Sequence, residues 1–84
     1  MFEVVHPTFL IATGDCDRVE VLRSPLVNDT KRMYAPVRQF IAEHGLVLAA
    51  RQTFEDDDWM FGEVEVSVYV PPSVRNTTYA GLLN

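Results

Sequence analysis

The sequence predicts a small α+β domain, with a mainly antiparallel four-stranded sheet and one amphipathic helix packed on one face. Residues from Val64 to Val70 place valine at every second position, which is the period of a strand. Met33, Val37, Phe40 and Ile41 follow the spacing of one helix face. The chain has 84 residues and is 48% hydrophobic, enough for one core but not for two. We therefore expect one domain over residues 1–84.

The first predicted elements are two strands that pair as a hairpin. Residues 2–13 are rich in Val, Phe, Ile and Thr and are expected to form the first strand. Pro7 interrupts it and cannot donate to a ladder, which favours an edge strand or a bulge. Residues 13–17 have the composition of a turn. Residues 18–22 then alternate and are expected to form the second strand.

A single helix follows the break at Ser24 and Pro25. Residues 28–30 are all good helix N-caps, but Pro36 is costly inside a regular helix. We therefore expect a 3₁₀ or loose helical turn over residues 29–34 and a regular helix over residues 35–44. Gly45 lies where a left-handed C-cap belongs.

The last two predicted strands cover residues 46–54 and 62–70, and an acidic run forms the turn between them. In the second of these strands, the valines are expected to face the helix and to complete the core. The other face would then be open to water or covered by a partner. Two prolines end the strand and the folded core at residue 72. Residues 73–84 are expected to be a short helical turn or a tail.

The charge balance excludes several classes of partner. Twelve acids against seven bases give a net charge of -5. Nucleic-acid backbones and anionic membranes require basic surfaces, so neither is expected to bind directly. No apolar run is long enough to span a membrane. The single cysteine and the lack of a secretory leader predict a cytoplasmic location.

The strongest candidate for a binding site is the acidic turn together with the aromatic residues that follow it. Buried aromatics tend to dominate binding energy, while charges around them steer encounter. The alternative reading is a solvated turn that keeps the strands soluble. The run lacks the spaced ligands of a calcium loop, so no metal site is expected. The predicted partner-binding residues are Glu55, Asp56, Asp57, Asp58, Trp59, Phe61, Glu63, Glu65 and Tyr69.

No catalytic residue and no cofactor is predicted, and the protein is not expected to be an enzyme. The sequence lacks the common metal, nucleotide and nucleophile motifs. His44 suits a helix C-terminus, and the acids around Cys16 disfavour its thiolate. A pairing of Cys16 with His6 or His44 stays open as a minor alternative.

These observations favour a small acidic module that binds a protein with a basic surface. Proteins that handle nucleic acid have such surfaces, because their working face must be basic. The module would act as an inhibitor, an immunity factor or an adaptor, in a virus or a mobile element. The alternative is an assembly subunit that forms a homodimer or larger oligomer through an aromatic sheet face or an edge strand.

Overall fold

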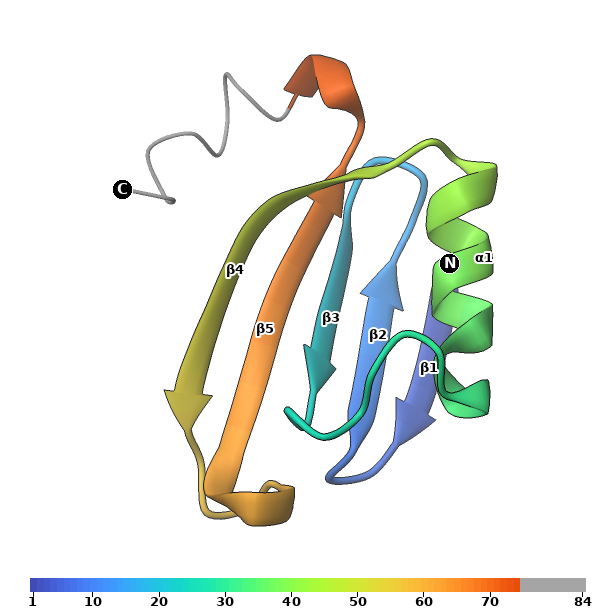
Figure 1. Ribbon diagram of the computed structural model, residues 1–84. Helices are drawn as coiled ribbons and strands as arrows, with labels where there is room; N and C mark the ends of the chain where they lie inside the picture. The colour runs from blue at the N-terminus through green and yellow to red at the C-terminus, as the bar shows by residue number, and fades with distance from the viewer. Residues whose placement is uncertain (75–84) are drawn as a thin grey trace.

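The computed structural model describes residues 1–74, which form one five-stranded antiparallel sheet with a helix on one face (Figure 1). The strand order is β1-β2-β3-β5-β4, and every neighbouring pair is antiparallel. Two short 3₁₀ helices accompany the regular helix. The elements are β1 (Phe2–His6), β2 (Leu10–Gly14), β3 (Val19–Arg23), η1 (Arg32–Tyr34), α1 (Ala35–Glu43), β4 (Val47–Glu55), η2 (Met60–Gly62) and β5 (Glu63–Val70).

The prediction of four strands was wrong because the first predicted strand is a hairpin. Residues 2–13 contain β1 and most of β2, which pair with each other around a three-residue turn. Pro7 lies in that turn, where its missing N–H costs no ladder hydrogen bond. Both halves favour strands by composition, so the proline was the only sign of the break. The expected hairpin with the next strand is present as β2 and β3.

The helical segment begins as a 3₁₀ turn and becomes regular at Ala35. Pro36 therefore lies in the first turn of α1, where its lack of an N–H does no damage. Gly45 takes a left-handed φ of 62° just after the helix. Its N–H donates to the carbonyl of Ala42 at 3.2 Å, and that of Leu46 donates to Ile41 at 3.0 Å. The expected helix and its glycine C-cap are both confirmed.

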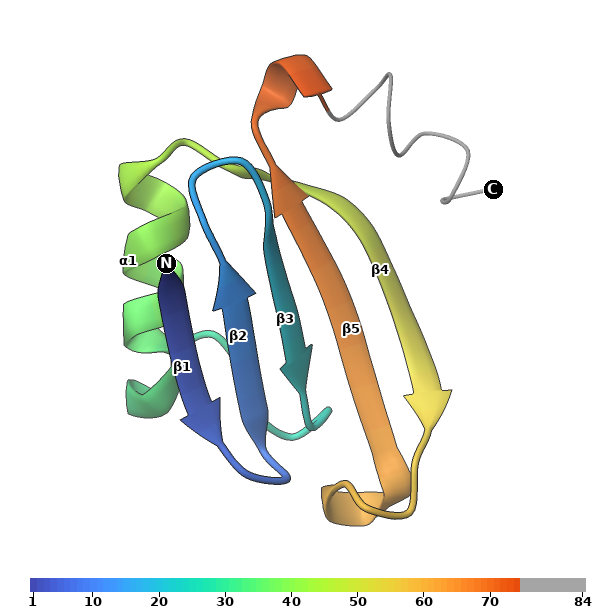
Figure 2. The ribbon, with the colours of Figure 1, turned by 180° about the vertical axis from the view of Figure 1, so that it is seen from behind.

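The helix packs on one face of the sheet, here called the helix face. Its core contacts are Leu10, Ala12, Val19 and Val21 of β2 and β3. In Figure 1 the helix stands over the β1 side of the sheet and leaves the β4 side uncovered, which Figure 2 shows from behind. One nine-residue helix is too narrow to cover five strands.

The valines of β5 lie on the opposite face, here called the far face. In the register, Tyr69 lies opposite Val19, Ser67 opposite Val21 and Glu65 opposite Arg23, so these β5 residues share the helix face. The expectation that the valines meet the helix was therefore wrong. Alternation separates the two faces of a strand but does not tell which one the helix covers.

The far face has a small apolar cluster of its own, formed by Ala49, Val68 and Val70, with Val74 packed against it. The last described turn closes with a hydrogen bond from the N–H of Val74 to the carbonyl of Pro71, at 3.0 Å. Residues 75–84, to which most of the expected tail belongs, lie outside the described residues. Within residues 1–74, no helix is long and apolar enough to cross a membrane.

Candidate functional site

The acidic run forms the closed end of the β4–β5 hairpin, and we call residues 55–63 the acidic tip. Asp56 stabilises the turn through three hydrogen bonds. Its side-chain Oδ1 accepts from the N–H of Asp58 at 3.0 Å, and its carbonyl accepts from the N–H of Trp59 at 3.0 Å. Its own N–H donates to the carbonyl of Gly62 at 3.1 Å. The tip is therefore an ordered turn with one acid, Asp56, in a structural role.

Within residues 1–74, no base pairs with the carboxylates of the tip. Among residues 1–74, the three ion pairs join Arg18 to Glu20 and both Arg23 and Arg51 to Glu65, so none reaches the tip. In addition, Glu55 and Glu63 lie directly opposite each other across the two strands. Like charges in that position are destabilising. The tip therefore concentrates negative charge at some cost to the fold.

Aromatic side chains are exposed at the same end of the molecule. Phe61 is 68% exposed and holds a left-handed backbone with φ of 65°, which is unfavourable for a bulky residue. Trp59 is half-buried. Phe54, on the far face opposite Val64, is 49% exposed. Phe54 was not among the predicted site residues, because a phenylalanine near the end of a strand gives no sign of its exposure.

The tip is attached to the neighbouring β1–β2 turn. The N–H of Met60 donates to the carbonyl of Thr8 at 3.2 Å. Thr8, like Phe61, has a left-handed backbone, with φ of 67°. Both turns lie at the same end of the sheet in Figure 1. This contact holds the acidic tip beside the body of the domain.

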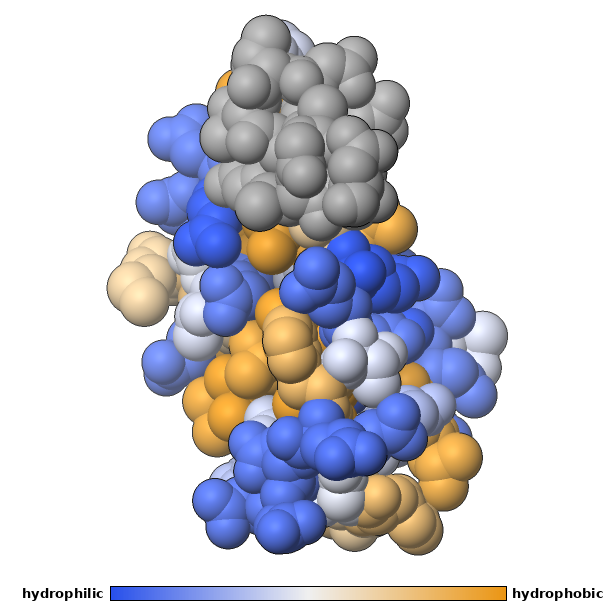
Figure 3. Space-filling model, turned by 90° about the vertical axis from the view of Figure 1, so that its left-hand side faces the viewer, coloured by the Kyte–Doolittle hydropathy of each residue, from blue (hydrophilic) through white to orange (hydrophobic). Residues whose placement is uncertain are grey.

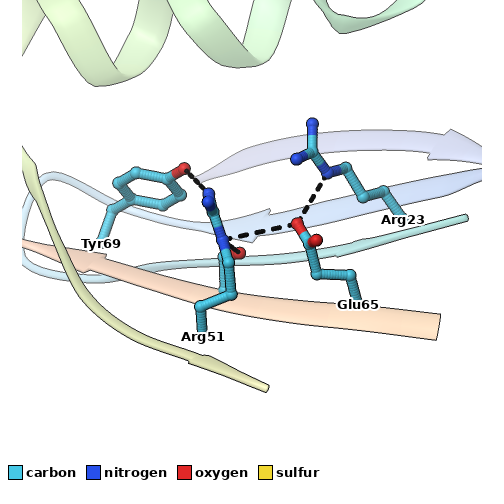
Figure 4. A network of polar contacts seen from close by, with 5 residues as sticks. Arg23, Arg51, Glu65 and Tyr69 are labelled. Atoms are coloured by element: carbon cyan, nitrogen blue, oxygen red, sulfur yellow. Dashed lines mark hydrogen bonds and ion pairs between the residues drawn. The ribbon is translucent and has the colours of Figure 1, made fainter. Parts of the chain in front are cut away.

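Two residues that were predicted to belong to the partner-binding site, Glu65 and Tyr69, instead lie in a polar network on the helix face (Figure 4). Arg23 Nε donates to Glu65 Oε1 at 2.9 Å, and Arg51 Nε lies 3.4 Å from the same oxygen. Arg51 Nε also donates to Ser67 Oγ at 2.9 Å, and Arg51 Nη2 donates to the Tyr69 hydroxyl at 3.1 Å. The structure thus separates these two residues from the tip.

The polar network occupies the part of the helix face that α1 leaves uncovered. The side chains of Arg23 and Glu65 are only 16% and 19% exposed, while that of Arg51 is 41% exposed. The Arg23 guanidinium also lies over the Tyr34 ring, 5.4 Å from its centre. Two guanidinium groups share one carboxylate, so the group carries one excess positive charge. Sequence reasoning missed both arginines, because nothing local marks two residues 28 positions apart as neighbours.

Tyr34 gives the network a measurable alkaline titration. Burial raises the pKa of Tyr34 well above its ordinary value of 10.0; the neighbouring Tyr69 adds to the rise, and Arg23 and Arg51 oppose it. Above pH 10.0 the unfolded chain releases this proton while the folded protein retains it, so stability falls as pH rises. We expect a tyrosinate absorbance titration to show Tyr34 ionising only as the protein unfolds. The Tyr34→Phe variant should lose less stability above pH 10.0 than the parent; an equal loss would contradict this account.

The other candidate chemical groups are Cys16, His44 and His6. Cys16 is exposed in the β2–β3 turn, and the His44 ring packs 4.3 Å from that of Phe40. Cys16 and His44 both line a shallow hollow of about 380 Å³, and no hydrogen bond joins them in the described part of the chain. His6 does not line that hollow. Within residues 1–74, no three His, Cys, Asp or Glu side chains are placed to hold a metal ion.

Comparison with known proteins identifies a family. The family described as Gene product 70 matches residues 8–79, which is most of the chain. No curated protein and no solved structure matches the chain. A numbered gene product is the type of description given to phage and viral proteins, which agrees with the viral setting expected from the sequence. The chain therefore belongs to the Gene product 70 family.

Proposed function

We propose that this protein is a small acidic binding module without catalysis, which captures a protein with a basic surface through its acidic tip. The observation that carries the proposal is the set of five carboxylates in residues 55–63, none of them paired with a base among residues 1–74. A fold selected for stability alone would not place Glu55 opposite Glu63. A basic partner would neutralise this charge on binding, and the charge would speed capture.

The aromatic side chains near the tip supply the apolar part of this surface. Phe61 is the most exposed aromatic residue of the tip, and Trp59 lies half-buried beside it. Phe54 extends the apolar surface onto the far face. Large aromatic side chains that become buried on binding supply most of the affinity, while the surrounding charges select the partner. Glu65 and Tyr69 act here as the framework that holds β5 in position.

The partner class follows from this chemistry. A protein that handles nucleic acid has a basic working face, and an acidic tip would compete with the phosphate backbone for it. The module would then act as an inhibitor or adaptor of such a protein, in the cytoplasm of an infected cell. The family description supports the viral setting of this proposal.

Neutralising the tip is the direct test. In the variant Asp57→Asn, Asp58→Asn and Glu63→Gln, three charges are removed and Asp56 keeps its role in the turn. The matched control removes three exposed acids elsewhere, through Glu3→Gln, Asp17→Asn and Asp29→Asn. A basic partner is captured from host lysate and identified, and its association rate with each purified variant is measured. We expect the tip variant to associate about tenfold more slowly at low salt and the control to stay near the parent.

The salt dependence separates charge-driven capture from apolar self-association. Raising the salt from about 0.1 M to 0.5 M should weaken binding by the parent strongly and binding by the tip variant much less. If the two triple variants slow association equally, only the net charge matters and the tip is not the site. If the protein recovers only itself at both salt concentrations, the proposed function is wrong.

A further inference from the structure

The outer edge of β4 is an open strand edge. β4 is the last strand in the sheet order, and its only strand partner in the described part of the chain is β5. All five residues from Arg51 to Glu55 are exposed, and we call them the β4 edge. Figure 3 looks at the molecule from this side and shows apolar surface running between hydrophilic side chains. Among residues 1–74, no strand pairs with the backbone N–H and C=O groups on this side, so another strand can add there.

The β4 edge lacks most of the features that prevent strand pairing, and its two charged residues, Arg51 and Glu55, are opposite in sign. Natural edges are blocked by prolines, lysines, bulges or short strands. The bulge of β4 lies between Leu48 and Ala50, outside the β4 edge. Residues 51–55 pair with β5 in regular register and contain neither proline nor lysine. A second strand can therefore add along all five residues.

We propose that two copies of this chain pair antiparallel through their β4 edges, with the two-fold axis at Thr53. In this register, Arg51 lies opposite Glu55 of the second copy, and the same pair forms again on the other side of the axis. Both residues lie on the helix face, because Arg51 is opposite Ser67 and Glu55 is opposite Glu63 within the chain. A two-fold axis at Gln52 would instead place Arg51 opposite Thr53 of the second copy. Neither Arg51 nor Glu55 would then have a charged partner across the seam. Charge complementarity thus selects a second copy and one register.

The two charged groups are available for this contact. Among residues 1–74, Arg51 uses Nε and Nη2 for Ser67, Glu65 and Tyr69, and no contact within that range uses Nη1. The Arg51 side chain is 41% exposed. Glu55 has no ion pair among residues 1–74 and lies opposite Glu63. Pairing with an arginine of the second copy would offset that repulsion.

The same register also covers Phe54. Its side chain is 49% exposed on the far face, beside a hollow of about 230 Å³ that Ala50, Gln52 and Phe54 help to line. Gln52 of the second copy would lie directly opposite Phe54. The two Phe54 residues would be diagonal neighbours, about 7–8 Å apart along the sheet, which aromatic side chains can bridge. The dimer would thus bury an aromatic group that the monomer leaves in water.

This inference does not depend on the proposed function. The acidic tips of the two copies would lie at opposite ends of the shared seam, so each could still meet a partner. The tip variant described above changes none of residues 51–55. The two ideas can therefore fail separately.

Two charge-reversal variants test the register, with sedimentation measured over a range of protein concentrations. Glu55→Lys and Glu63→Lys change the net charge equally, and each turns the repulsive pair within the chain into an attractive one. Only Glu55→Lys places a cation opposite Arg51 of the second copy. We expect Glu55→Lys to weaken dimerisation by about tenfold or more and Glu63→Lys to leave it near the parent value. Thermal melting should show both variants at least as stable as the parent.

A cross-link tests the axis itself, in a background with Cys16→Ser. Thr53→Cys should form a disulfide-linked dimer under mild oxidation, because residue 53 of one copy lies directly opposite residue 53 of the other. Gln52→Cys should not form this disulfide, because residue 52 of the second copy is a diagonal neighbour and lies too far away. A parent protein that stays monomeric up to about 1 mM would overturn the inference. Equal weakening by both lysine variants, or no cross-link at Thr53, would overturn this register.

Discussion

Replacing Glu65 with alanine is expected to lower the free energy of unfolding by about 2–4 kcal/mol. This is less than the usual cost of breaking a fully buried ion pair, because the side chains of this network are partly exposed. Glu65 Oε1 is the shared acceptor of Arg23 at 2.9 Å and Arg51 at 3.4 Å. Without it, two guanidinium groups would face each other, and the mostly buried Arg23 would lose its only ion pair in residues 1–74. Leaving a buried charge without its partner costs more than the pair itself contributes.

Urea unfolding of Glu65→Ala beside Glu63→Ala checks this expectation. Glu63 lies two residues away on the same strand and face, but it lies opposite Glu55 and has no ion pair in the described residues. Glu63→Ala should therefore be neutral or slightly stabilising. Glu65→Gln, which keeps the shape and one oxygen acceptor, should fall between the two alanine variants. If both alanine variants had the same small effect, the network would not contribute to stability.

The fold class could be predicted because its signals are local. The 3₁₀ turn before Pro36, the helix and the glycine after it depend on adjacent residues, and the structure has all three. Period-two alternation likewise identified β5. The hairpin within residues 2–13 was not predicted, because Pro7 is compatible with both an edge strand and a turn. Only the pairing of β1 with β2 shows that Pro7 lies in a turn.

The assignment of faces failed for a different reason. Alternation shows that Val68 and Tyr69 lie on opposite faces of β5, but not which face the helix covers. That depends on the pairing of β5 with β3, which places Tyr69 beside Val19 of the helix core. The alternating valines resemble a core row, but it is the polar row of β5 that lies on the helix face.

The candidate site was predictable in part for the same reasons. The acidic tip is a continuous stretch of sequence, so its charge and position between two strands could be read directly. The grouping of Glu65 and Tyr69 with Arg23 and Arg51 depends on register between β3, β5 and β4. No local pattern in the sequence carries that register. Side chains that act together across a sheet are therefore harder to predict than those that act together within a turn.

Replacing Gly14 with alanine is expected to destabilise the protein by about 2–4 kcal/mol, through overpacking and an unfavourable backbone conformation together. Gly14 ends β2 with φ of 149°, a conformation that residues with a side chain rarely adopt. An added Cβ would clash with the carbonyl oxygen of Arg18 and would lie 2.7 Å from the Cα of Val19. Neither is a side chain that can move aside, and Val19 is completely buried. The β2–β3 hairpin would have to open for the methyl group to fit.

Gly45→Ala separates the backbone conformation from the clash. Gly45 also has a positive φ, of 62°, but a Cβ there would meet no atom within 4 Å. Its alanine variant should lose only about 1 kcal/mol, the usual cost of a left-handed alanine. The difference between the two variants in urea unfolding therefore measures how tightly β2 and β3 meet at this corner. If Gly14→Ala costs no more than Gly45→Ala, the two backbones do not approach as closely as described, and the pairing of Gly14 with Val19 would be wrong.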